Sequence, residues 1–333
     1  MYDRGINTAT LNMIAYFNQQ QVRGSLAYSQ LIPALRLAFS EKNVAPARHV
    51  HTVSAENNTS LLLMPVWQEN AHAGVKLVTV APHNKHAPSV HAIFILFDSA
   101  SGVPLAIMDG EELTARRTAA ASALASEYLS RTDSRHLLVV GNGSLASHMA
   151  VAHCQTRAIS SITVWGRSVE KSMQCAAAIR HHVELPSSVK VIAEENLEAA
   201  CDAADIISCV TTSKMPVVPG KWVRKGTHLD LVGGFKPDMR EVDDELMRKA
   251  MVVVDTYTGA MTEAGDILQP LANGSLVRES IVAELADLCG QRHLGRIDHE
   301  QITVFKSVGS AVEDLCAANL VWNAAQAAPH QTI

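Results

Sequence analysis

The stretch that decides the fold runs from Ser134 to Arg167 and reads SRHLLVVGNGSLASHMAVAHCQTRAISSITVWGR. Its apolar run at Leu137 to Val140 is typical of a buried parallel strand and stops at the glycine turn Gly141-Asn142-Gly143. A helical pattern begins at Ser144, and a second β-branched run covers Ile162 to Trp165. Strand, glycine turn, helix and strand in this order form the unit that places a pyrophosphate on a helix N-terminus.

The glycine turn therefore predicts a dinucleotide site along residues 141–146. Gly141 permits the tight turn, and Gly143 lets the backbone approach the phosphate. Ala146 is small enough for the helix to pack against the strand. The intervening cofactor-binding positions are Ser144 and Leu145. The alternative interpretation is an ordinary strand-to-helix turn that binds nothing.

The end of the second strand indicates which dinucleotide is bound. An acid at this place would bind the ribose hydroxyls of NAD, but the chain has Gly166-Arg167-Ser168 there. No carboxylate would repel a 2′-phosphate, and the donors of Arg167 suit one, with Ser168 beside it. We therefore expect NADPH, with NADH as the less favoured cofactor. The alternative is that Arg167 is a solvated surface charge.

Composition narrows the class of protein. The 333 residues are 47% apolar and 18% charged, with a net charge of -5, which gives no reason to expect nucleic acid or an anionic membrane as partner. No apolar run approaches the roughly 18 residues of a membrane span, and the N-terminus lacks a secretory pattern. Six scattered cysteines favour a reducing cytoplasm, and the histidines show no metal-ligand spacing, so we expect no metal.

Hydrophobic periodicity predicts two kinds of architecture along the chain. Residues 1–130 contain a helical stretch at 26–39, where Pro33 predicts a kink or a late start. Several strand-like runs of a mixed sheet follow, and then a long alanine-rich helix at 111–130. Residues 131–305 alternate strand and helix patterns, which predicts a doubly wound parallel sheet. Ligands bind at the carboxyl edge of such sheets, where we expect Thr211, Thr212, Ser213, Val232 and Gly233.

Five segments together resemble the ornithine cyclodeaminase/mu-crystallin family. They read MDGEELTARRTAAAS, VVGNGSLASHMA, CVTTSKMPVV, GTHLDLVGG and ITVFKSVGSAVEDL, and the match covers about residues 30–325. The resemblance implies a Rossmann domain, residues 131–305, inserted into a mixed α+β domain that binds substrate and forms a homodimer, residues 1–130 plus 306–333. It also implies chemistry on a carbon–nitrogen bond next to a carboxylate.

The resemblance also implies site residues. Arg48 and Arg117 match arginines that hold the substrate carboxylate, and Lys76 matches a lysine near the reacting imine. A lysine in a partly apolar pocket can exchange protons near neutrality. His51 is expected to share the strand face of Arg48 as a second polar contact. Each of these residues has the alternative interpretation of a solvated or merely structural side chain.

We expect the nicotinamide of the cofactor to lie between the two domains. The residues expected around it are Thr211 to Ser213, Val232-Gly233 and the turn from Lys306 to Gly309.

One departure from the family pattern bears on the substrate. Cyclodeaminases have an aspartate after the glycine pair, where this chain has Phe235, and Asp238 is displaced by three residues. The segment GGFKPDMREVDDE instead resembles reductases of 1-pyrroline-2-carboxylate and 1-piperideine-2-carboxylate, small cyclic imino acids whose products are L-proline and L-pipecolate. Alternatives are an alanine or N-alkyl amino-acid dehydrogenase, an ornithine cyclodeaminase, and a non-catalytic NADPH-dependent binder like mu-crystallin. Both ring sizes stay open.

Overall fold

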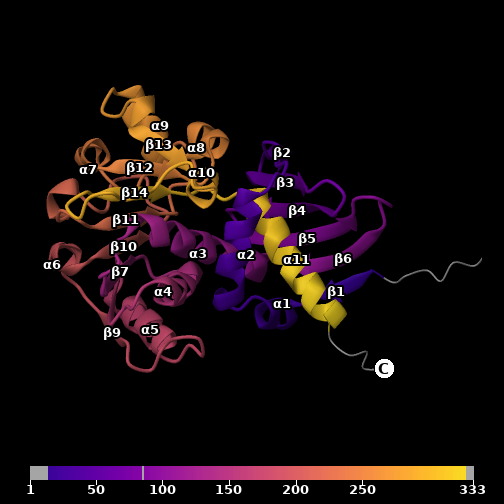
Figure 1. Cartoon of the computed structure of the whole chain (residues 1–333), viewed down its shortest axis with the longest axis horizontal. Coiled ribbons are helices and arrows are strands. Elements are labelled where there is room, and N and C mark those ends of the chain that lie inside the picture. The colour runs from indigo at the N-terminus through magenta and orange to yellow at the C-terminus, as the bar shows by residue number, and fades with distance from the viewer. Residues whose placement is uncertain (1–13, 85, 328–333) are drawn as a thin grey trace, which may run out of the picture.

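The computed structural model describes residues 14–84 and 86–327. Two sheets lie side by side along the long axis of the molecule, each with its own helices (Figure 1). We call the six-stranded sheet with α1, α2, α3 and α11 the N-terminal body. The eight-stranded sheet with α4 to α10 is the Rossmann body.

The Rossmann body is a doubly wound parallel sheet, as predicted. Its strand order is β13-β12-β14-β11-β10-β7-β8-β9, and every pairing is parallel. Leu137 and Val139 face one apolar cluster, while Leu138 and Val140 face another, so both faces of the sheet are covered. The strands are β7 His136–Val140, β8 Ser161–Trp165, β9 Lys190–Ala193, β10 Ile206–Cys209, β11 His228–Leu231, β12 Met251–Val254, β13 Ile281–Glu284 and β14 Thr303–Lys306.

Helices of the Rossmann body begin at polar caps where the sequence supplies them. Ser168 accepts a hydrogen bond from the backbone of Lys171 at the start of α5, and Asp243 does the same for Leu246 in α7. The helices are α4 Ser144–Thr156, α5 Val169–Arg180, α6 Leu197–Ala203, α7 Asp244–Lys249, α8 Tyr257–Glu263, α9 Gly265–Ala272 and α10 Leu285–Cys289.

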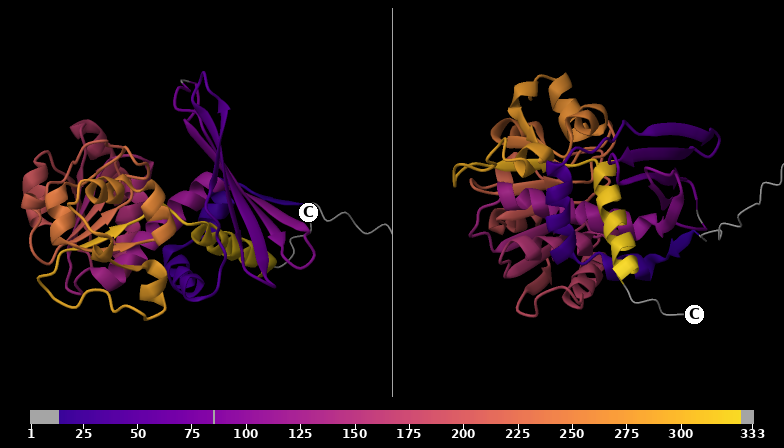
Figure 2. Two further views of the ribbon diagram at one scale, coloured as in Figure 1. Left: turned by 90° about the horizontal axis from the view of Figure 1, so that it is seen from above. Right: turned by 45° about the vertical axis from the view of Figure 1, so that its right-hand side comes forward.

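The N-terminal body is a mixed sheet with helices on one face. Its order is β1-β6-β5-β4-β3-β2, and only the β1–β6 pairing is parallel. Seen from above, the helices lie on one side of this sheet and leave the other side open (Figure 2). The elements are β1 Ala15–Phe17, β2 His49–Ser54, β3 Thr59–Trp67, β4 His72–Val80, β5 Val90–Asp98, β6 Pro104–Asp109, α1 Gln19–Ser25, α2 Tyr28–Ser40, α3 Gly110–Leu129 and α11 Ala311–Ala327.

Two helices connect the bodies. The alanine-rich α3 is buried along most of its length and packs against α2, α4 and α11, because its small side chains permit close approach on every side. After β14 the chain leaves the Rossmann sheet, and α11 packs on α2, α3, β3 and β4. Lys306 is the last residue of β14.

The sequence patterns missed some elements of the structure. The short strands β1, β6 and β13 were not predicted, since each is brief or follows directly on a turn. Pro33 predicted a kink or a late start, and the late start is excluded, because Pro33 lies inside α2, which begins at Tyr28.

Candidate active site

Lys76 lies on the covered face of the N-terminal sheet. It lies in β4, where it is paired with Met64 of β3 on one side and with Phe94 of β5 on the other. Phe94 is in turn paired with Met108 of β6. All four side chains are buried, and Lys76 is only 2% exposed. Its Nζ lies 2.8 Å from the carboxylate of Asp314, near the start of α11. The strand pattern therefore places a single ammonium group in an otherwise apolar row.

Arg117 reaches the same carboxylate from α3. Its Nε donates to Asp314 Oδ1 at 2.9 Å, and its Nη1 donates to Glu313 Oε2 at 2.6 Å. Glu313 and Asp314 are fully buried, a position that carboxylates rarely take without paired cations. Lys76 and Arg117, distant in sequence, are thus joined through Asp314.

Arg48 approaches from the other side of the turn that precedes α11. Its Nη2 donates to the carbonyl oxygens of Gly309 at 2.9 Å and Val308 at 3.2 Å. Gly309 has a φ of 87°, and a Cβ there would lie 2.7 Å from Nη1 of Arg117. Both arginines therefore meet at Gly309, and only glycine fits between them.

Asp255 holds the turn that contains Gly309 through hydrogen bonds to its backbone. Its Oδ2 accepts hydrogen bonds from the backbone amides of Val308 and Gly309, each at 2.7 Å, and from the Ser307 hydroxyl at 3.1 Å. Asp255 follows β12 directly and is fully buried. It ties the end of β12 to the end of β14 and thereby sets where Gly309 lies.

The surroundings of Lys76 lower its pKa. Burial and the nearby Arg117 and Arg48 lower the pKa of Lys76, Asp314 opposes them, and the result is a pKa of about 8. Burial raises the pKa of Glu313 to about 7, against the attraction of Arg117. An ammonium group that titrates near neutrality can give a proton to a substrate and recover it.

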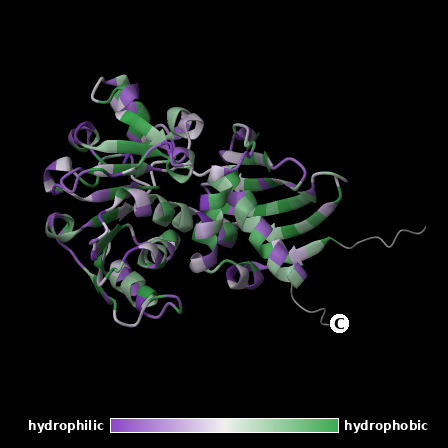
Figure 3. Ribbon diagram, in the orientation of Figure 1, coloured by the Kyte–Doolittle hydropathy of each residue, from purple (hydrophilic) through white to green (hydrophobic). Residues whose placement is uncertain are grey.

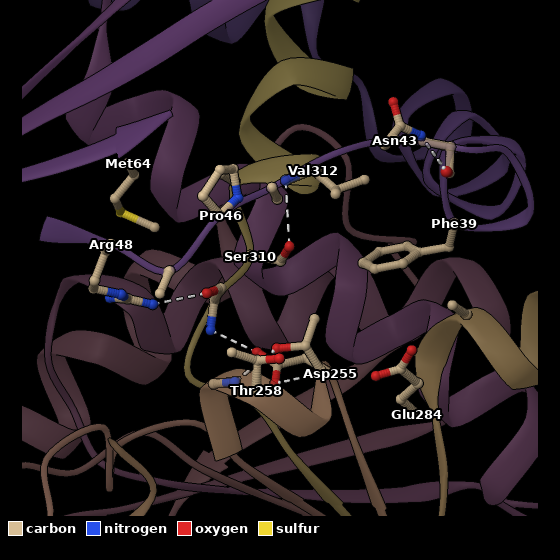
Figure 4. A pocket seen from close by; sticks show the side chains of 18 of the residues that line it. Phe39, Asn43, Pro46, Arg48, Met64, Asp255, Thr258, Glu284, Ser310 and Val312 are labelled. Carbon is tan, nitrogen blue, oxygen red and sulfur yellow. Dashed lines mark hydrogen bonds between the residues drawn. The ribbon is translucent and has the colours of Figure 1, made fainter. Parts of the chain in front are cut away.

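A cavity of about 270 Å³ opens beside Arg48 at the junction of the two bodies. Arg48 and Met64 lie at one end of it, and Phe39 and Glu284 lie at the other (Figure 4). Ser310 lies between them. The cavity is wide enough for a small molecule with Arg48 at its edge.

His51 does not share the face of Arg48, and this part of our prediction is wrong. The two residues are three positions apart, and alternation along a strand places positions an odd number apart on opposite faces. His51 pairs with Leu61 and His49 with Leu63, and the two imidazole rings are 6.4 Å apart on the uncovered face.

The glycine turn lies at the carboxyl edge of β7. Gly141 has a φ of 126°, and a Cβ there would lie 2.8 Å from the Val210 carbonyl oxygen, so only glycine fits. No atom lies within 4 Å of the place that a Cβ of Gly143 would take. Within residues 14–84 and 86–327, the amides of Ser144 and Leu145 have no hydrogen-bond partner. Free amides at a helix start are suited to a phosphate.

A buried glutamate, Glu241, joins the segments that follow β10 and β11 by hydrogen bonds, and the sequence patterns did not reveal it. Glu241 accepts hydrogen bonds from the amide and hydroxyl of Thr211, at 2.7 and 2.8 Å, and from the amide of Gly233 at 2.8 Å. The Lys306 side chain is fully buried and pairs with Asp266 at 3.2 Å. Thr212 and Ser213 remain accessible at this edge, while Val232 is buried.

Four further side chains follow strand ends of the Rossmann sheet. Arg167 is exposed just beyond β8, and Asn142 donates to the Ser168 carbonyl oxygen at 3.2 Å, which joins the glycine turn to that loop. Phe235 is 42% exposed, and the carboxylate of Asp238 is exposed and paired with Lys214 at 2.7 Å.

The described residues offer neither a metal-ligand cluster nor a membrane-spanning helix. Among residues 14–84 and 86–327, no three His, Cys, Asp or Glu side chains are grouped so that they could hold a metal ion. Across the same part of the chain, every helix is too short or too polar to cross a bilayer.

Fold and site together define a class: a two-body α/β protein with a Rossmann dinucleotide-binding fold and a cavity edged by Arg48 at the junction of its two bodies. The profile of the ornithine cyclodeaminase/mu-crystallin family matches residues 13–328. The chain belongs to this family, and it is an oxidoreductase.

Particular relatives agree with this assignment. The Delta(1)-pyrroline-2-carboxylate reductase of Colwellia psychrerythraea is 39% identical over 309 residues, which is 91% of this chain and 96% of the relative. The structure of the Thermococcus litoralis enzyme of that name, in complex with NADH and L-proline, has a TM-score of 0.89 and 33% identity, covering 94% of this chain and 98% of that one. An archaeal alanine dehydrogenase dimer with bound NAD has a TM-score of 0.86 and 27% identity, with coverage of 94% and 96%.

Proposed function

We propose that the protein reduces cyclic ketimines with NADPH, converting 1-pyrroline-2-carboxylate to L-proline and 1-piperideine-2-carboxylate to L-pipecolate. The observation that carries the proposal is that Lys76 and Arg117 share Asp314 in the first turn of α11, while Arg117 and Arg48 meet at Gly309 in the turn just before it. Two guanidinium groups suit a carboxylate, and one ammonium group with a lowered pKa suits an imine nitrogen. The reductases among the relatives support this substrate class.

The residues proposed to hold the cofactor fit a dinucleotide. The amides of Ser144 and Leu145 and the open space at Gly143 would take the pyrophosphate, and Arg167 would take a 2′-phosphate. Thr211 to Ser213, Gly233 and the turn up to Gly309 would border the nicotinamide. A reduced nicotinamide bound there supplies a hydride.

In the proposed mechanism the chain orients the imine and provides its proton. Arg48 and Arg117 hold the carboxylate, which places the adjacent carbon toward the edge of the Rossmann sheet. Lys76 transfers a proton to the ring nitrogen, directly or through a water molecule, and this makes the neighbouring carbon a better hydride acceptor. The sum is one proton and one hydride added across the carbon–nitrogen double bond. Asp314 keeps the donor and Arg117 at one place.

Substrate class is tested by oxidation of NADPH and NADH with each of the two cyclic imines, alongside pyruvate with ammonia or methylamine. We expect the imines to have the higher kcat/KM. Higher kcat/KM with pyruvate and ammonia would favour the alanine dehydrogenase alternative, which the archaeal structural relative supports. Tight cofactor binding with no turnover of any substrate would favour a small-ligand binder like mu-crystallin. Ornithine cyclisation has less support, because Phe235 cannot transfer a proton and Asp238 is paired at the surface.

Replacing Arg167 by glutamine is expected to raise the KM for NADPH by about 10-fold and leave that for NADH within about 2-fold, because only NADPH carries the phosphate that a guanidinium binds. Steady-state kinetics with both cofactors measures this. Lys190→Gln is the matched control, since Lys190 is an exposed cation at the opposite, amino end of β9. Equal changes for the two cofactors would contradict the proposed phosphate contact.

The N-terminal sheet supports a further part of the proposal, a homodimer. Pro65, Val75, Ile95 and Ile107 form one cross-strand row on the face that carries no helix, and each is partly exposed. Figure 3 shows these strands as largely hydrophobic. Strands that are apolar on both faces indicate burial on both, so a second copy of the chain would cover this face. A single species with the mass of one chain in sedimentation equilibrium would contradict it.

We also propose two domains. The substrate domain comprises residues 1–130 and 306–333, and the cofactor domain comprises residues 131–305. A cytoplasmic location fits the six cysteines, all of which are free. Fractionation of cells that express the chain would test the location.

A further inference from the structure

Glu263 of the Rossmann body pairs directly with Arg48, one of the two arginines of the proposed carboxylate-binding site. It is the last residue of α8, and its Oε1 lies 2.9 Å from Nε of Arg48 in the N-terminal body. Neither side chain is fully enclosed, since Arg48 is 18% and Glu263 25% exposed. This ion pair therefore bridges the junction beside the cavity, which both residues line.

The position of Glu263 is unfavourable for an anion unless a cation compensates. The carboxyl end of a helix carries partial negative charge, and a carboxylate there is repelled. Burial raises the pKa of Glu263, while Arg48 acts in the opposite direction. Arg48 thus supplies the compensating charge, which indicates that the pair is a built contact.

The hydrogen bonds of Arg48 show which of its nitrogens is still available to a ligand. The Nε edge faces Glu263, and Nη2 donates to the carbonyl oxygens of Val308 and Gly309. In the part of the chain that the structure describes, no acceptor bonds to Nη1. The guanidinium is therefore held at Nε by Glu263 and at Nη2 by the turn, and its Nη1 is the nitrogen available to a carboxylate.

We propose that Glu263 is a positioning residue that holds Arg48 ready for the substrate carboxylate and makes carboxylate binding depend on contact between the two bodies. The inference rests on the proposed function, because it takes the ligand of Arg48 to be the imino-acid carboxylate. It adds to that function a residue from the Rossmann body that acts through Arg48. Glu263 needs no contact with the substrate to do this.

The test compares Glu263→Gln with the matched control Glu41→Gln. Glu41 lines the same cavity, but its carboxylate bonds to Gln68 and not to Arg48. We expect Glu263→Gln to raise the KM for the imine by about 10-fold with kcat within about 3-fold, because a charge-assisted contact that orients a binding group is lost. Affinity for NADPH, measured by fluorescence titration, stays unchanged, and Glu41→Gln behaves like the unmodified chain.

A double-mutant cycle separates positioning from a general structural role. If Glu263 acts through Arg48, adding Glu263→Gln to Arg48→Met changes KM no further, whereas an independent structural effect adds to it. A lowered KM in Glu263→Gln would mean that Glu263 competes with the substrate for Arg48 and would overturn the proposal. Equal effects of Glu41→Gln, or full additivity in the cycle, would also overturn it.

A binding measurement keeps this inference distinct from the enzymatic function. Calorimetric titration of the unmodified, cofactor-loaded chain and of Glu263→Gln with pyrrole-2-carboxylate, a planar analogue of the imine, reports on carboxylate binding without turnover. We expect the variant to bind about 10-fold more weakly. If the unmodified chain binds the analogue but reduces no imine, the proposed function fails while weaker binding by the variant still supports the role of Glu263. If it neither binds the analogue nor reduces an imine, both proposals fail.

Discussion

Replacing Lys76 by methionine is expected to lower kcat for imine reduction by about 1000-fold, within the range that a positioned general acid contributes. Methionine keeps most of the volume of the lysine stem in the row formed by Met64, Phe94 and Met108, so packing changes little. Asp314 retains Arg117 as its partner, so no buried carboxylate is left alone. Stopped-flow measurement of NADPH oxidation with saturating imine gives the comparison.

The control for this variant is binding rather than turnover. The affinity for pyrrole-2-carboxylate and the thermal unfolding midpoint should stay close to those of the unmodified chain, because Arg48 and Arg117 still hold the carboxylate. Undiminished turnover by Lys76→Met would remove Lys76 from the mechanism. A collapse of ligand binding together with kcat would assign it to structure.

The same lysine determines the expected pH dependence. Only the protonated amine can donate, and its population falls as the pH rises through the pKa of about 8. The reductive kcat should therefore decrease above about pH 8 in the unmodified chain. Because Asp314 raises the pKa of Lys76, Asp314→Asn should move this decrease to lower pH. A reductive kcat that increases above pH 8 would contradict the assignment of Lys76 as donor.

Replacing Arg117 by lysine should raise the KM for the imine by about 100-fold, because a lysine ammonium lacks the planar fork with which the guanidinium bonds Asp314 and Glu313 through Nε and Nη1 and still presents Nη2 to the substrate carboxylate. Lysine is chosen because alanine would leave Glu313 and Asp314 as buried unpaired carboxylates and would threaten folding. Steady-state kinetics and calorimetry with pyrrole-2-carboxylate both measure the effect.

Arg116→Lys is the matched control for this variant. Arg116 is the adjacent residue of α3, equally buried, but it faces Glu112 and Glu184. A similar rise of KM in Arg116→Lys would show that α3 is merely destabilised by losing an arginine. No rise in Arg117→Lys would exclude Arg117 as the carboxylate ligand.

The Rossmann body was predictable from the sequence because its signals are local. The apolar run before Gly141, the glycine turn and the alternation of strand and helix patterns are each contained in a few tens of residues. The motifs that identified the family are equally local, and the family comparison confirmed them. The error at His51 was also local, since the face of a strand depends on whether the offset from Arg48 is odd or even.

The site itself depends on long-range contacts. Lys76 and Arg117 meet only because β4, α3 and α11 pack together, and no pattern near either residue reveals that they share Asp314. The adjacent acids Glu313 and Asp314 were visible in the sequence as charges within an apolar helix. That signal could have marked them as partners for buried cations.

The sequence by itself determined the two kinds of architecture and the glycine turn, because periodicity and motif spacing are properties of short segments; Arg48, Lys76 and Arg117 came from the resemblance to the family. Only the tertiary structure decided which groups face one another: Asp255 beneath the turn at Gly309, Glu241 between two strand ends, and Glu263 against Arg48. The physical reason is that burial and charge pairing arise where distant segments pack together. Packing of this kind lowers the pKa of Lys76 through burial and the nearby arginines. It also occupies Nε and Nη2 of Arg48 and leaves Nη1 for a ligand.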